Sequence, residues 1–461
     1  MPETVSLPES QPLDTPIGPN HESLPRLRDL TEAIIALGKS EGASAVEAAA
    51  SCNAGLSVNV RLGAVETIEH TRDKGMGVTV YIGQRKGSAS TSDFSAAAVR
   101  QTVRAACEIA RHASEDPHAG LAEEHRLARD PIELELFHPW DLAAEEAITI
   151  ATEVEDAART ADARISNSEG ASVSRSDSLF VYGNSHGFLQ GYPSSRQSLS
   201  CSVIAGETDS MQRDYWYSVA RNAGDLQDPQ VVGQMAAQRT VARLNARQLS
   251  TRETAVVYSA DVARGLFQHF VSAVRGASQF RKATFLHDQA GKQVFPEFMR
   301  LHEQPHLLRA LGSCSFDGEG VATAARDLVT DGVLRGYVLD SYSARQLKLQ
   351  TTGNAGGVHN LTVEPNAGDL NELLAQMGNG LLITELMGFG INGVTGDYSR
   401  GASGFWIENG SVAFPVEEIT VAGNLRDIFM GIRCVGNDID ARGNIRCGSV
   451  LVDRMTVAGN G

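Results

Sequence analysis

Alternating apolar and polar residues over positions 56–90 are the feature that most limits the possible folds of this chain. The runs are separated by glycine-containing breaks, which is typical of antiparallel strands joined by short turns. A helix is predicted on each side, over 24–42 and over 93–114, the second with Asp93 or Ser95 as its N-cap. These segments predict an α+β unit ending near residue 125. The apolar stripe of the second helix consists of Ala96, Val99, Val103, Ala106 and Ala110.

A second group of predicted strands follows one more helix. Residues 141–162 indicate a helix with Asp141 as its N-cap and early glutamates suited to the positive end of the helix dipole. Residues 178–222 contain β-rich runs divided by turn residues. Beyond them, two helical stretches lead into a long C-terminal half rich in glycine and strand-forming residues. There, Asn409-Gly410 between two strand-like runs predicts a tight hairpin.

The predicted fold class is therefore α+β, with an N-terminal helix and antiparallel strands, a middle sheet region and a large strand-rich C-terminal domain. Chain length alone favours two or three domains. The first residues are rich in Pro, Ser and acidic side chains, which is typical of a disordered tail. The predicted boundaries are a tail at 1–24, an N-terminal domain at 25–125, a middle domain at 126–230 and a C-terminal domain at 231–461.

Charge and cysteine usage narrow the classes of function. A net charge of −16 argues against a direct nucleic-acid surface, because phosphate binding needs clustered Lys and Arg. Six dispersed cysteines without a CxxC pair favour reduced thiols in a reducing compartment. The first residues lack the pattern of a signal peptide, and no apolar run reaches the roughly 18 residues of a membrane span. We therefore expect a cytoplasmic protein without a membrane or nucleic-acid partner.

Residues 302–306, His-Glu-Gln-Pro-His, match the HExxH signature of zinc peptidases letter for letter. That signature requires one helix that directs both histidines at a single metal while the glutamate activates a water. Pro305 lies inside the required turn, where its ring removes a backbone donor and clashes with the preceding turn. We therefore predict that His302 and His306 do not face a common metal from consecutive helical turns.

Two further motif matches lack the context that their chemistry needs. Residues 183–187 form a GxSxG, but a nucleophilic serine elbow needs a helix after Ser185, and turn residues follow it instead. Residues 388–393 form a GxGxxG after a strand-like run, with Glu408 at a spacing suited to a ribose contact. No helical pattern follows that could direct its N-terminus at a pyrophosphate. We predict that neither segment precedes a helix or binds its usual ligand.

Five long stretches carry more information than any of these short motifs. They are residues 181–205, 281–299, 351–360, 381–410 and 418–452. With shorter runs from about residue 30 onward, they resemble the TldD/PmbA family of bacterial and archaeal peptidases, in particular its PmbA or TldE branch. The resemblance implies an α+β chain with the regions described above. It also implies a cytoplasmic heteromeric metalloprotease, with a TldD-like subunit as partner and peptides as substrates.

The resemblance also indicates where metal ligands should be sought. In the TldD branch, zinc is held by two histidines of a helical HExxxH segment and by a cysteine near the C-terminus. Here the matching helix is expected at 259–276, with His269, Phe270 and Val274 at the three motif positions and Cys447 at the cysteine. Phenylalanine cannot deprotonate a water and valine cannot ligate a metal. The zinc site is thus expected to be incomplete, with zinc in the partner subunit.

Both remaining ligand positions also have simple structural interpretations. The histidine at 269 would then be a core or interface side chain, and the thiol at 447 a small buried hydrophobe. Four residues among glycines are candidates for a substrate cleft, because glycines let a peptide backbone approach closely. The alternatives are a loop histidine bonded to nearby backbone and a turn whose aspartate satisfies its own amides. The four are His359, Asp397, Tyr398 and Arg400.

Three functions are compatible with these observations. We expect a PmbA/TldE-like subunit of a heteromeric TldD/TldE metalloprotease that degrades or processes unfolded or extended peptides, with zinc chemistry supplied by the TldD-like partner. A different class of function is a non-catalytic regulatory binding protein, a modulator of DNA gyrase or of toxin–antitoxin peptides. The third is a self-sufficient peptidase with a site around His302, His306 and Cys447.

Overall fold

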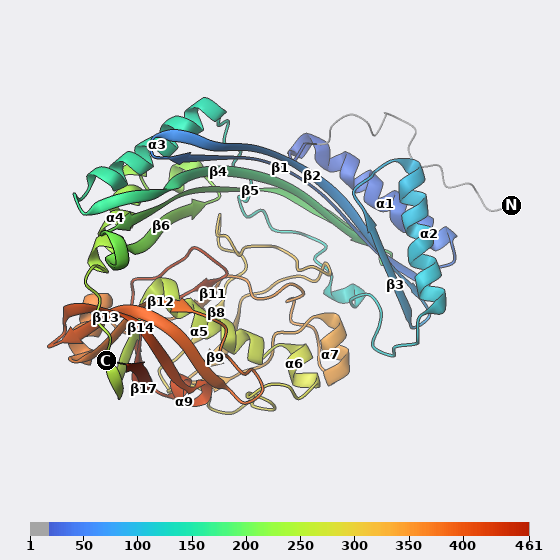
Figure 1. Ribbon diagram of the computed structural model, residues 1–461. Helices are drawn as coiled ribbons and strands as arrows, with labels where there is room; N and C mark the ends of the chain where they lie inside the picture. The colour runs from blue at the N-terminus through green and yellow to red at the C-terminus, as the bar shows by residue number, and fades with distance from the viewer. Residues whose placement is uncertain (1–17, 461) are drawn as a thin grey trace.

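The computed structural model describes residues 18–460, and a six-stranded antiparallel sheet arches over the C-terminal part of the chain (Figure 1). Its strand order is β3-β2-β1-β4-β5-β6. At the centre, β1 pairs with β4 from Glu47 opposite Asn184 to Val60 opposite Ala171. The N-terminal and middle regions thus contribute three strands each to one sheet. The strands are β1 (Ala45–Arg61), β2 (Ala64–Ile82), β3 (Arg85–Thr91), β4 (Ile165–Asn184), β5 (Phe188–Ala205) and β6 (Gln212–Ala220).

The two central strands begin earlier than the sequence pattern indicated, at Ala45 and Ile165. Their first halves are rich in alanine, serine and glycine, which have weak strand propensity. Pairing on both sides in the middle of the sheet holds them extended, because strand propensity depends strongly on neighbours. The α+β fold class predicted from sequence is confirmed.

Four helices pack against the sheet in two pairs, and each pair closes a separate hydrophobic core. As predicted, α2 has Ser95 as its N-cap, whose Oγ accepts a hydrogen bond from the Ala98 amide. The predicted cap Asp141 is wrong. Leu142 is buried, and α3 starts only after Ala143, whose backbone is extended and whose side chain makes no capping hydrogen bond. The helices are α1 (Leu24–Ser40), α2 (Ala96–His112), α3 (Ala144–Thr160) and α4 (Pro229–Ala242).

The described part of the chain begins at residue 18, within the predicted tail. Of the predicted tail at 1–24, residues 1–17 lie outside it, and a short helical turn at His21–Ser23 leads into α1. Within residues 18–460, no helix is both long and apolar enough to cross a membrane.

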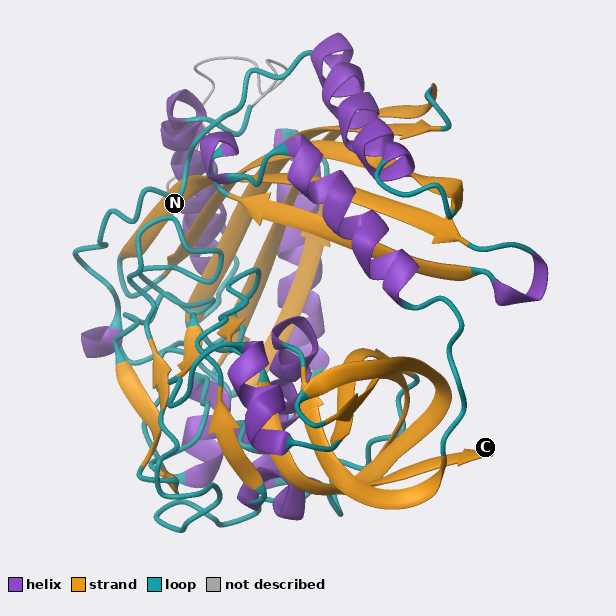
Figure 2. Cartoon of the chain, turned by 90° about the vertical axis from the view of Figure 1, so that its left-hand side faces the viewer, coloured by secondary structure: helices purple, strands orange, loops and turns teal. Residues whose placement is uncertain are grey.

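The C-terminal part contains two sheets around the largest hydrophobic core. Figure 2 shows its strongly curled strands beneath the arch. The six-stranded sheet has the order β14-β13-β12-β7-β17-β15, and the five-stranded sheet has the order β10-β9-β8-β11-β16. The strands are β7 (Ser250–Tyr258), β8 (Leu301–Glu303), β9 (Arg326–Thr330), β10 (Val333–Leu334), β11 (Leu361–Val363), β12 (Gly380–Met387), β13 (Asp397–Glu408), β14 (Ser411–Asn424), β15 (Ile432–Val435), β16 (Ile445–Arg446) and β17 (Val450–Asn460). The helices are α5 (Ala260–Ala273), α6 (Gly276–Phe280), α7 (Ser341–Leu347), α8 (Leu370–Met377) and α9 (Leu425–Met430).

The hairpin predicted at Asn409-Gly410 is confirmed. These two residues join β13 to β14 and have φ angles of 52° and 76°. Both values lie in the left-handed region, which Asn and Gly tolerate and which matches the twist of the paired strands.

Candidate substrate cleft and degenerate metal positions

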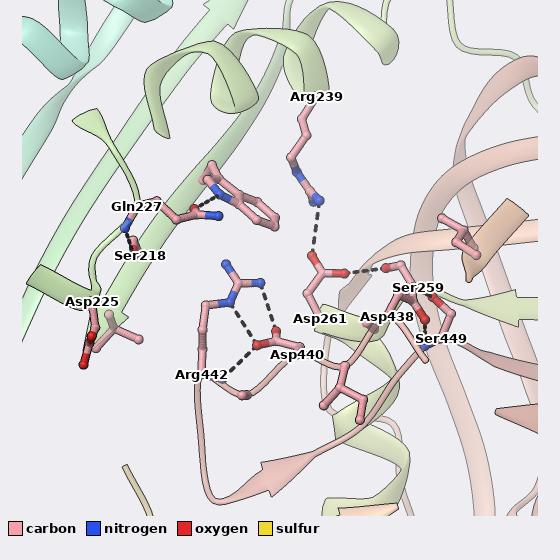
Figure 3. Close-up of a pocket in the computed structure, with 16 residues that line it drawn as sticks. Ser218, Asp225, Gln227, Arg239, Ser259, Asp261, Asp438, Asp440, Arg442 and Ser449 are labelled. Carbon is pink, nitrogen blue, oxygen red and sulfur yellow. Dashed lines mark hydrogen bonds and ion pairs between the residues drawn. The ribbon is translucent and has the colours of Figure 1, made fainter. Parts of the chain in front are cut away.

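A cleft lies between strand β6 of the arch and the C-terminal part of the chain (Figure 3). It consists of two adjoining cavities of about 470 and 270 Å³, and we call them together the β6 cleft. Both cavities are lined by Trp216 of β6, Arg239 of α4, Asp261 of α5 and Arg442 of the loop between β15 and β16. Elements from the middle and C-terminal regions of the chain therefore meet at one cleft.

Arg442 is held rigidly in this cleft. Its guanidinium stacks over the rings of Trp216 and Tyr217, at 4.3 and 4.2 Å from their centroids. It also pairs in a bidentate manner with Asp440, at 2.9 Å for both contacts, and donates to the Tyr217 carbonyl at 2.9 Å. Burial disfavours the charge on Asp440, but the hydrogen bonds from Arg442 outweigh it and lower the pKa of Asp440. Stacking and hydrogen bonds thus fix the position of this guanidinium at the cleft wall.

An ion-pair chain joins the two walls of the cleft. Arg239 of the sheet side lies 3.3 Å from Asp261 of α5 and 3.4 Å from Asp214 of β6. The Asp261 carboxylate also accepts a hydrogen bond from Ser259 at 2.5 Å, at the start of the same helix. Figure 3 shows Arg239 reaching across toward Asp261. These contacts join the sheet side of the cleft to α5.

The sequence did not point to these lining residues. Trp216 lies in a predicted strand, and Arg442 in a stretch used only for the family resemblance. The aromatic run at 214–217 and the charged run at 438–442 are the signals that could have found them. Neither run is informative alone, because the cleft exists only where the two meet.

Of the four predicted cleft residues, Arg400 lines the smaller cavity of the β6 cleft. Asp397 begins β13, and its carboxylate accepts a hydrogen bond from Thr395 of the preceding turn at 2.6 Å. Tyr398 is buried, and its ring meets the His269 ring edge-on at 6.0 Å. The neighbours Tyr398 and Arg400 both point toward the α5 side of β13, as alternation along a strand requires.

His359 lies elsewhere, beside the five-stranded sheet. Its ring nitrogens lie 3.1 Å from the Cys314 sulfur and 3.0 Å from the Gly353 carbonyl, and its amide donates to Glu303. Burial raises the pKa of the Cys314 thiol to about 12, with nearby Asp317 and Glu303 adding to the shift. A neutral thiol of this kind is a poor nucleophile.

Four positions are expected to match the zinc ligands and the catalytic glutamate: 269, 270, 274 and 447. Their side chains do not form a zinc site. Phe270 and Val274 are fully buried, and the Phe270 ring packs edge-on against Phe295 at 5.0 Å. The Cys447 thiol is also fully buried, where it donates to the Gly448 carbonyl, and burial raises its pKa well above the usual value. Zinc in hydrolases needs about three N, O or S ligands from the protein, and two of these four side chains offer none.

His269 is, besides Cys447, the other position of this set whose side chain could ligate a metal. It is half-buried on α5, and burial together with the positive charge of Arg400 lowers the pKa of its ring. Across residues 18–460, no group of three or more His, Cys, Asp and Glu side chains is arranged to hold a metal.

The prediction for the HExxH stretch is confirmed. His302 and Glu303 lie on strand β8, and Pro305 begins a turn. The His302 ring bonds to Asp327 at 2.6 Å, whereas the His306 ring bonds to Thr323 at 3.0 Å. The two histidines are therefore committed to different partners.

The prediction that neither of the other two motifs precedes a helix is confirmed. Ser185 lies in the turn between β4 and β5, and its hydroxyl accepts a hydrogen bond from the Val46 amide at 3.1 Å. The glycines at 388–393 connect β12 to β13, and Glu408 ends β13 beside Trp406. Without a following helix, neither loop has the N-terminal dipole on which its usual chemistry depends.

Comparisons with known proteins agree with this architecture. The models of PmbA/TldA metallopeptidase domain 1, central domain and C-terminal domain match residues 46–110, 137–244 and 251–459. "Metalloprotease PmbA" of Escherichia coli O157:H7 is 50% identical over 92% of this chain and 94% of its own. "Metalloprotease PmbA homolog" of Haemophilus influenzae is 48% identical over 94% of this chain and 96% of its own.

Solved structures share the fold over almost the whole chain. A Bacteroides thetaiotaomicron protein, named as a candidate modulator of DNA gyrase, superposes with a TM-score of 0.89 at 25% identity, covering 96% of this chain and all of its own. TldE from Thermococcus kodakarensis superposes with a TM-score of 0.81 at 19% identity, covering 93% of this chain and all of its own. Three consecutive domain matches and close full-length relatives lead to one assignment. The chain belongs to the PmbA/TldD metallopeptidase family, in its PmbA (TldE) branch.

Proposed function

We propose that this chain is the substrate-gripping subunit of a heteromeric metallopeptidase and acts on unfolded or extended peptides. A TldD-like subunit supplies the zinc ion and the base that activates water. Both subunits are cytoplasmic. The six cysteines, all unpaired in the described structure, support a reducing compartment.

The interior of helix α5 is the observation that carries this proposal. The side chains at 270 and 274, where a catalytic base and a ligand are expected in the TldD branch, belong to the hydrophobic core. A hydrolytic step needs a base within hydrogen-bond reach of the attacking water, and a phenyl ring cannot serve. Peptide hydrolysis by the assembly must then use groups of another subunit.

The β6 cleft supports the gripping role. It is lined by stacked arginines, aromatic rings and carboxylates, which are the groups that fix a peptide's backbone and side chains. The ion pair between Arg239 and Asp261 joins its two walls. The proposed division of labour is therefore peptide binding here and bond cleavage at the partner's metal.

Cleavage of an unfolded fluorogenic peptide by the chain alone, by a TldD-like subunit alone and by the two together tests this proposal. We expect turnover only with the TldD-like subunit present, strongest in the mixture, and sensitive to a chelator. Replacing the partner's catalytic glutamate should abolish turnover, whereas His269→Ala in this chain should leave most of it. Metal analysis of each purified protein should find zinc with the partner.

Two outcomes would overturn the proposal. Robust, chelator-sensitive turnover by this chain alone would place a complete active site within it. A stable complex with the partner that binds peptides and cleaves none would instead favour a regulatory binding protein.

A further inference from the structure

The smaller cavity of the β6 cleft contains more guanidinium groups than carboxylates. Its acidic residues are already engaged: Asp214 and Asp261 contact Arg239, and Glu385 pairs with Arg243 at 2.5 Å. The four arginines that line it are Arg239, Arg264, Arg400 and Arg442, against the carboxylates of Asp214, Asp261 and Glu385.

Arg400 is the arginine of this set without a carboxylate partner. Within residues 18–460, its side chain makes one polar contact, from Nε to the Met387 carbonyl at 3.5 Å, at the outer limit of hydrogen bonding. Arg264 is weakly paired, with Asp440 at 3.9 Å and the Tyr217 hydroxyl at 3.1 Å. Both guanidinium groups therefore retain unused donors at the cavity wall.

The positive charge of Arg400 affects the ionisation of a neighbouring histidine. It is half-buried on β13 and helps to lower the pKa of His269 on the facing helix, after burial as the larger cause. A cation in a partly desolvated position attracts an anion more strongly than one in bulk water. An anionic group entering the cavity would therefore be drawn to this end.

The larger cavity has the opposite charge balance. Two arginines line it, Arg239 and Arg442, and both also line the smaller cavity. The carboxylates that line it are Asp225, Asp261, Asp438 and Asp440. Because like charges repel, an anionic group is disfavoured there and favoured in the smaller cavity.

We propose that the smaller cavity binds a carboxylate of the peptide substrate, with Arg400 as its principal contact and Arg264 as a second donor. A guanidinium matches the geometry of a carboxylate through two parallel hydrogen bonds. The residues preceding that carboxylate occupy the larger cavity. This assignment rests on the proposed function, since it names the class of peptide that the cleft accepts.

Either a C-terminal carboxylate or an acidic side chain could supply this chemistry, and three dye-labelled peptides of one neutral sequence distinguish them. One ends in a free carboxylate, one is amidated, and one is amidated but carries an internal glutamate. Fluorescence anisotropy with the full chain measures their dissociation constants. We expect at least one acidic peptide to bind about tenfold more tightly than the neutral amide, the difference of one charge-assisted contact.

Substitution of the arginine isolates the contact. Arg400→Gln should remove the tenfold preference while the neutral amide binds as before, and Arg400→Lys should restore part of it. Arg433→Gln is the matched control, because that guanidinium pairs with Asp453 on the exposed surface. Thermal unfolding of each variant confirms that it is folded.

The outcomes separate this inference from the proposed function. Equal binding of acidic and neutral peptides by the unmodified chain would overturn the carboxylate site and leave peptide gripping intact. A preference that persists in Arg400→Gln would also overturn the assignment. If no peptide binds, with or without the partner subunit, both ideas fail. A carboxylate preference without hydrolysis by the assembled subunits would contradict only the proposed function.

Discussion

The network around Glu303 and the β6 cleft both bring together charged residues from distant segments, but they differ in what those residues face. Glu303 is 1% exposed, and its carboxylate is fully engaged by Arg326 at 2.8 Å, the Asn354 side chain at 2.7 Å and the His359 amide at 2.7 Å. In the cleft, the guanidinium groups of Arg400 and Arg264 retain free donors toward a cavity.

The difference shows why a motif's letters are a weak guide to chemistry. The glutamate of the HExxH match is buried and already accepts hydrogen bonds from three protein groups, so it is not placed to activate a water on a metal. The cleft residues match no motif, yet their unused hydrogen-bonding capacity faces solvent. Polar groups that satisfy each other stabilise the fold, whereas those left unpaired beside a cavity are available to a ligand.

Among the substitutions that test this comparison, Glu303→Ala in the buried network should cause the largest loss of stability. It leaves the half-buried Arg326 guanidinium without its carboxylate, at a cost of about 3 to 5 kcal/mol in the free energy of unfolding. Urea denaturation measures the loss. The control is Glu364→Ala, because that carboxylate is 45% exposed where it pairs with Arg300 and should contribute less than about 1 kcal/mol. Equal losses from both variants would contradict the closed network.

Trp216→Ala should weaken peptide binding in the β6 cleft instead. Removing the ring on which Arg442 stacks should weaken peptide binding about tenfold, because aromatic anchors in a cleft contribute disproportionately to binding. Trp406→Ala is the matched control, since that ring lies under Arg252 away from the cleft. Fluorescence anisotropy of a labelled peptide compares them. Similar weakening by both variants would remove the special role of the cleft.

Cys447→Ser tests whether the thiol at the expected cysteine-ligand position is only a buried structural group. The thiol is fully buried and donates to the Gly448 carbonyl, so we expect a stability loss of about 1 kcal/mol. Peptide hydrolysis with the TldD-like partner should be unchanged. A folded variant that has lost this hydrolysis would place the thiol in the catalytic site.

Glu319 resembles Glu303 in that its carboxylate faces protein groups, accepting a hydrogen bond from the Ser341 amide at 2.9 Å, and Glu319→Gln tests its contribution through pH. Burial raises the pKa of Glu319 from 4.5 to about 7, so the folded state holds this proton to higher pH than the unfolded state. The resulting stability is fully present below about pH 4.5 and is lost as the pH rises toward 7. Glutamine cannot titrate, so the free energy of unfolding, measured by urea denaturation at pH 5, 6 and 7, should fall less steeply with pH in the variant, by less than about 1 kcal/mol per pH unit. An unchanged slope would refute the shift.

Local sequence determined the elements whose causes lie within a few residues. Ser95 caps α2, Asn409-Gly410 turns a hairpin, and Pro305 prevents a helix, because each depends on the backbone preferences of its own segment. The family resemblance predicts the degenerate positions at 269, 270 and 274 in the same way, from residue types alone. Phenylalanine and valine cannot act in zinc chemistry in any fold.

Tertiary structure decided the rest. The alanine-rich start of β1 is a strand because its neighbours on both sides pair with it, and Asp141 fails as a cap because Leu142 is buried just before the helix. The β6 cleft depends on contacts such as that between Tyr217 and Arg442, which lie 225 positions apart. Which charges meet and which stay unpaired depends on how the arched sheet sits over the C-terminal part, because an ion pair forms only between groups that the fold brings within about 4 Å.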